Sequence, residues 1–72
     1  MSYELTNEEK ATIVNQHLKN VESNIFNLEI SLIEENAVSI PNATNVSSLN
    51  AQLAEANAKK TALLAELSEV TV

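Results

Sequence analysis

Residues 11–32 read ATIVNQHLKNVESNIFNLEISL, and their apolar side chains recur at alternating steps of three and four residues. Residues 46–70, VSSLNAQLAEANAKKTALLAELSEV, repeat this rhythm, which only Lys60 interrupts. Steps of three and four place side chains on one face of an α-helix, so each stretch predicts a helix with one apolar face. We call the residues of these two faces the seam: Ala11, Val14, Leu18, Val21, Ile25, Leu28, Leu32, Val46, Leu49, Leu53, Ala56, Lys60, Leu63, Leu67 and Val70.

The two faces match each other if the chain reverses near Ile40 and Pro41. Such a reversal pairs Leu32 with Leu49, Leu28 with Leu53, Ile25 with Ala56, Leu18 with Leu63, Val14 with Leu67 and Ala11 with Val70. The sequence therefore predicts an all-α fold, an antiparallel two-helix hairpin of coiled-coil type that assembles into a helical bundle. Residues 1–72 form one domain, with helices over about 7–36 and 45–70 and a turn over about 37–44.

Local signals predict where the helices begin. Thr6 followed by Glu9 has the spacing of a capping box, so the first helix is expected to start at Asn7. Pro41 has no amide hydrogen and interrupts the pattern. Either Thr44 or Asn45 is then expected to cap the second helix.

Composition limits the classes of function. The 72 residues include ten acidic and four basic side chains, a formal net charge of −6, with no cysteine and no glycine. This charge opposes binding to nucleic acid or to an anionic membrane. Disulfides and cysteine-based zinc sites are excluded, and phosphate-binding glycine loops are missing. A chain this short has a thin core, so we expect self-association.

A second apolar stripe on the first helix strengthens that expectation. It lies roughly 120° around the helix from the seam at about 100° per residue. We call it the outer stripe: Phe26, Ile30, Ile33 and Ala37. One partner helix cannot cover both faces, which predicts a homo-oligomer, most simply a dimer. The alternative is that the link from Val38 to Ile40 folds over Phe26 and Ile33 within one chain.

Candidate catalytic and metal-binding residues are few. His17 is the single histidine, aspartate and cysteine are absent, and no serine lies in a pattern that would activate it. Glu34 and Glu35 lack the Glu-x-x-His arrangement of metal-binding bundles. We therefore expect no enzyme activity, no catalytic or metal site and no cofactor. Lys60 falls opposite Val21, where a partnership with Glu22 would favour a role in fixing register over a catalytic one.

Several segments carry a resemblance to a known group of proteins. The chain resembles small uncharacterised helical proteins of marine cyanobacterial tailed phages along LTNEEK (5–10), NQHLKN (15–20), NLEISLIEENA (27–37) and SLNAQL (48–53). The resemblance implies a phage-encoded accessory protein and transfers no catalytic residue.

These observations predict a non-enzymatic structural or protein-interaction module, a self-associating helical hairpin of a phage or its virion. The alternative is a small regulatory binder that presents the stripe of Phe26, Ile30 and Ile33 to a helix of a host protein. No secretory signal or membrane-spanning run is apparent in the sequence. We expect a soluble protein, located in the cytoplasm of a host cell or associated with the virion.

Overall fold

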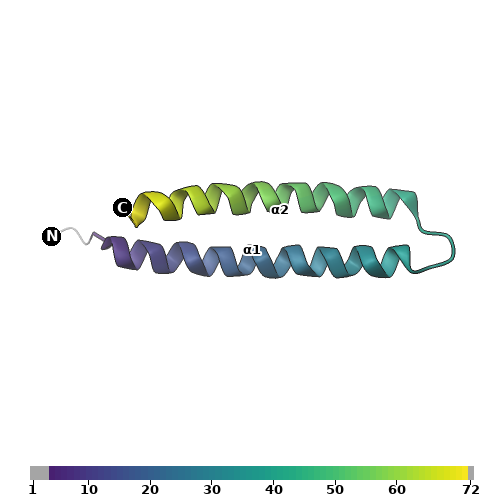
Figure 1. Cartoon of the computed structure of the whole chain (residues 1–72), viewed down its shortest axis with the longest axis horizontal. Helices are drawn as coiled ribbons and strands as arrows, with labels where there is room; N and C mark the ends of the chain where they lie inside the picture. The colour runs from purple at the N-terminus through teal and green to yellow at the C-terminus, as the bar shows by residue number, and fades with distance from the viewer. Residues whose placement is uncertain (1–3, 72) are drawn as a thin grey trace.

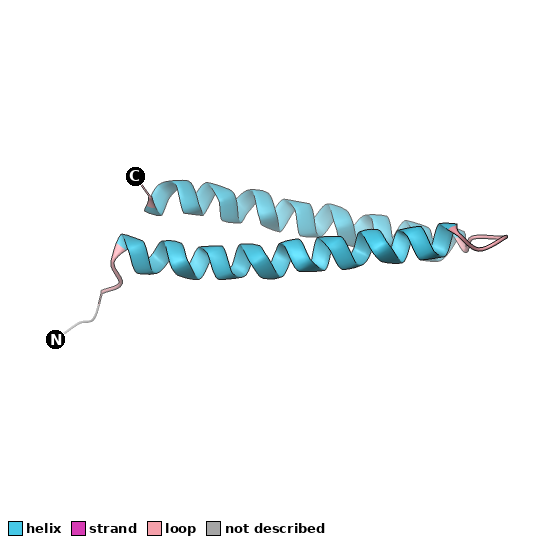
Figure 2. Cartoon of the chain, turned by 60° about the horizontal axis from the view of Figure 1, so that its bottom comes forward, coloured by secondary structure: helices cyan, strands magenta, loops and turns pink. Residues whose placement is uncertain are grey.

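The chain forms two long antiparallel helices joined by a short turn, as the computed structural model shows (Figure 1). It describes residues 4–71, in which helix α1 spans Asn7–Asn36 and helix α2 spans Ala43–Val70. The molecule measures 61 × 21 × 14 Å. In both ribbon views the helices lie side by side along their length (Figures 1 and 2). The predicted all-α hairpin is confirmed.

Helix α1 begins at Asn7 because Thr6 and Glu9 form a complete capping box. The Thr6 amide donates to Glu9 Oε1 at 2.9 Å, and the Glu9 amide donates to Thr6 Oγ1 at 3.1 Å. These bonds satisfy amides that have no partner within the helix. The hydrogen bonds from the Thr6 backbone and then from its side chain lower the pKa of Glu9 below its ordinary value.

Helix α2 begins at Ala43, earlier than the sequence pattern suggested, and the expected caps Thr44 and Asn45 are wrong. Asn42 is the N-cap, and its side-chain oxygen accepts the amide hydrogen of Asn45 at 3.1 Å. Asn42 has extended backbone angles, φ −79° and ψ 111°, as expected for a residue that directly precedes a helix. The turn is therefore shorter than expected, because Pro41 is followed at once by the cap.

The core is a single layer of side chains between the two helices. Every seam residue is buried or half-buried, and Val14, Leu18, Leu28, Ala56 and Val70 are the buried ones. Ala56, at 3% exposed, is the most enclosed of these five, and no side chain in residues 4–71 is completely buried. A helix packed against one neighbour can hide only one face, so the opposite faces remain open to solvent.

Candidate interaction surface

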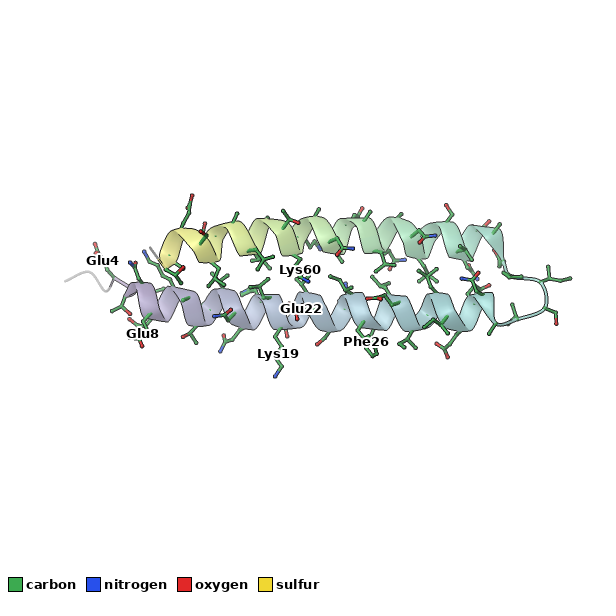
Figure 3. The ribbon with its side chains drawn as sticks, in the orientation of Figure 1. Glu4, Glu8, Lys19, Glu22, Phe26 and Lys60 are labelled. Carbon is green, nitrogen blue, oxygen red and sulfur yellow. The ribbon has the colours of Figure 1, made fainter. Side chains whose placement is uncertain are left out.

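The outer stripe lies on the side of α1 that faces away from α2. Phe26 and Lys19 both project from that side (Figure 3). Phe26 is 63% exposed, Ile33 64% and Ile30 38%, and Ala37 is also exposed. The alternative in which the link folds back over the stripe is wrong, because Ile40 itself is 88% exposed. No other segment of residues 4–71 covers the outer stripe.

Exposed apolar side chains concentrate near the turn. Eight large apolar residues are exposed in the part of the chain that the structure describes, and five of them fall between Phe26 and Ile40. The five are Phe26, Ile30, Ile33, Val38 and Ile40, whereas Leu5, Ile13 and Leu64 are scattered elsewhere. Single exposed apolar residues are normal, but a contiguous group marks an interaction surface.

Acidic side chains border the outer stripe. Glu22 and Glu29 lie on the flank nearer the seam, Glu34 lies on the other flank, and all three are exposed. Lys19 continues the line of the stripe toward the N-terminal end of α1. The stripe is therefore an apolar strip with carboxylates along its edges and one cation at its end.

Lys60 lies where the helices meet, and it partners the residue that the sequence suggested. Its Nζ is 4.0 Å from Oε1 of Glu22, with the two side chains 38% and 59% exposed (Figure 3). The stem of Lys60 thus occupies the seam while the ammonium reaches a carboxylate at its edge. An exposed pair at this distance contributes little to stability, and a role of Lys60 in fixing the register of the two helices stays a prediction.

Glu35 has a structural role that the sequence reading missed. Its Oε1 accepts the amide hydrogen of Asn42 at 2.9 Å, so the last turn of α1 holds the N-cap of α2. Glu35 and Ser31 are the half-buried polar residues of this end of α1, beside an open groove of about 470 Å³. The sequence does contain a sign of this role. Glu35 lies seven residues, or two helical turns, after Leu28 and therefore falls on the seam face of α1.

His17 is exposed, and residues 4–71 contain no cluster of three or more histidine, cysteine or acidic side chains suited to a metal ion. Neither helix of the described chain has an apolar stretch sufficient to cross a lipid bilayer. The outer stripe is an exposed apolar face that could pack against another helix.

The fold and the exposed residues together place this protein among coiled-coil-like helical hairpins, with one apolar face that the partner helix leaves exposed. No family model, no curated protein and no solved structure matched the chain. The outer stripe and the dimensions of the hairpin are therefore the observations from which we argue its function.

Proposed function

We propose that this protein is a non-enzymatic building block that self-associates through the outer stripe, with a dimer as the simplest assembly. The observation that carries the proposal is the exposure of Phe26 and Ile33, each nearly two-thirds open to solvent on one face of α1. Contact with a second copy would remove this surface from water, which is the main favourable term in association between proteins.

The surface area of the chain supports this proposal. Its accessible surface is 5540 Å², whereas a compact monomer of 7.8 kDa exposes about 4,400 Å². The excess of about 1,100 Å² is comparable to the roughly 800 Å² that each partner loses in an ordinary specific interface. A second copy could therefore cover the outer stripe and bring the exposed area per chain close to that of a compact protein.

The free energy gained when two copies bury the outer stripe is consistent with a weak, reversible dimer. Burying the exposed two-thirds of Phe26 and of Ile33 contributes about 1–2 kcal/mol for each side chain. Both copies together therefore gain about 4–8 kcal/mol from these residues, against several kcal/mol of lost freedom on association. Because this gain does not exceed the cost of association, the other exposed apolar residues near the turn must supply the net affinity, and we expect a weak, reversible dimer.

The resemblance to small phage proteins supplies the context. On that ground, we propose an accessory role in a virion or in its assembly, where a short rod-like unit adds contacts between larger parts. Mass spectrometry of purified particles tests the location. Recovery of this chain in stoichiometric amount supports the virion role, and its absence from the particles contradicts it.

Sedimentation equilibrium tests self-association directly. The wild-type chain should shift from monomer to dimer between about 50 µM and 2 mM, the range in which a dimer of such weak affinity dissociates. Phe26→Glu should remain monomeric and helical because it places a carboxylate within the apolar face. Ile13→Glu is the matched control, since it adds the same charge to the same helix at a residue that is 42% exposed and outside the stripe.

Two outcomes would contradict the proposal. One is a wild-type chain that stays monomeric throughout this range, which would favour the regulatory binder that keeps the stripe for a helix of another protein. The other is an assembly that Phe26→Glu leaves intact, which would place the contact elsewhere on the hairpin.

A further inference from the structure

The first turns of the two helices are capped in different ways. In α1, the Thr6 amide donates to Glu9, which lies three residues later in the same helix. In α2, the residue three positions after the N-cap Asn42 is Asn45, whose own amide donates to the Asn42 side chain. The Asn42 amide instead donates to Oε1 of Glu35 in α1 at 2.9 Å, the same length as the Thr6–Glu9 bond. The capping box of α2 is therefore completed by a carboxylate from the other helix.

Glu35 occupies a position at which the seam favours an apolar side chain. It is half-buried, and the chain reversal that pairs Leu32 with Leu49 also pairs it with Val46, another half-buried residue. A carboxylate at this position forgoes packing against Val46. Its hydrogen bond to the Asn42 amide supplies a physical reason for an acidic residue there.

We propose that Glu35 is a positioning residue that fixes where α2 begins, because it completes the capping box of this helix only when the hairpin is closed. Without Glu35, the start of α2 moves toward Thr44 or Asn45, whose side chains can also accept the hydrogen bond of a helix amide. The first turn of α2 thus depends on α1, whereas the first turn of α1 is capped by its own residues. This dependence belongs to the single chain and holds whether or not two copies associate.

The residue at which α2 begins can be measured by NMR in the Phe26→Glu background, which is expected to remain monomeric. In this parent chain, helical Cα chemical shifts should begin at Ala43. Glu35→Leu should move that start toward the next capping residues and raise the exchange rate of the Asn42 amide about tenfold, the effect of losing one hydrogen bond. Because leucine can pack against Val46, both helices should stay folded while the start of α2 moves.

Two further variants separate the hydrogen bond from the loss of charge. Glu34→Leu removes the same charge from the exposed neighbouring residue, and it should leave the start of α2 and the exchange of the Asn42 amide unchanged. Glu35→Gln removes the charge but keeps an oxygen acceptor, so α2 should still begin at Ala43, with exchange faster by about threefold at most. A Glu35→Gln chain that behaves like Glu35→Leu would assign the effect to charge and overturn the proposal.

Asn45→Glu provides a rescue from within α2. It places a carboxylate three residues after the N-cap, the arrangement that Glu9 has in α1. The chain that combines Glu35→Leu with Asn45→Glu should therefore begin α2 at Ala43 again. A Glu35→Leu chain whose α2 still begins at Ala43 would overturn the proposal, as would an equal effect of Glu34→Leu or a failure of Asn45→Glu to restore the start.

Discussion

Replacing Lys60 by leucine should stabilise the hairpin, although it removes an ion pair. Lys60 is a polar residue in an otherwise apolar face, and its side chain is 38% exposed. Its partner carboxylate, on Glu22, is 4.0 Å away and 59% exposed, so solvent screens the attraction. An exposed pair of this kind contributes at most about 0.5 kcal/mol. Leucine and lysine have nearly equal helix propensities, so burial decides the outcome.

The gain follows from the buried part of the side chain. A leucine fully removed from water contributes about 1.5–3 kcal/mol, and burial of roughly 60% of it contributes about 1–2 kcal/mol. Subtracting the ion pair, and the burial that the lysine stem already contributes, leaves a net stabilisation of at most about 1 kcal/mol. For a domain of this length, that difference raises Tm by about 4–8 °C.

Thermal and urea unfolding on the Phe26→Glu background measure this gain without a contribution from association. Lys59→Leu is the matched control, because Lys59 is the exposed neighbour and its replacement should change stability by less than about 0.5 kcal/mol. A Lys60→Leu chain that is no more stable than its parent would refute the reasoning. Amide NMR spectra give a second readout, because loss of the polar seam residue should allow slipped pairings and add minor peaks.

Three further predictions address the core, the caps and pH. Leu18→Ala should destabilise the hairpin by about 2–3 kcal/mol because Leu18 is buried, whereas Leu64→Ala, at a 47% exposed site, should cost about 1 kcal/mol in the same urea titration. Asn42→Ala should lower the free energy of unfolding by about 1 kcal/mol by removing the cap of α2, and amide exchange should rise in its first turn. Since the folded-state pKa of Glu9 is lowered, the contribution of its capping bonds is present above the unfolded value of about 4.5 and is lost as pH falls through the lower folded value. The Thr6 amide signal should report this loss in an acid titration, and Glu9→Gln should abolish the titration.

The sequence predicted the hairpin well because its two main determinants are local and periodic. The capping box at Thr6 defined the start of α1, and the alternating three- and four-residue steps identified residues that the structure buries or half-buries. A helix without glycine or proline has few alternatives when its apolar face is continuous. For this reason, the sequence alone identifies the residues of the seam.

The start of α2 was harder to predict because several residues in the turn can cap a helix. Asn42, Thr44 and Asn45 all have side chains that can cap a helix, and sequence alone does not rank them. The choice depends on the contact between Asn42 and Glu35, which joins residues from two elements. The exposure of Ile40 likewise depends on the path of the turn, so the uncovered stripe could be suspected from the sequence but not established.

Helix α1 begins and helix α2 ends at the same end of the rod, opposite the turn (Figure 1). The outer stripe lies toward the opposite end of a molecule 61 Å long. A domain fused to either terminus would therefore stand clear of the proposed contact. Two copies joined through the outer stripe would therefore keep this end of each hairpin free for attachment to other bodies.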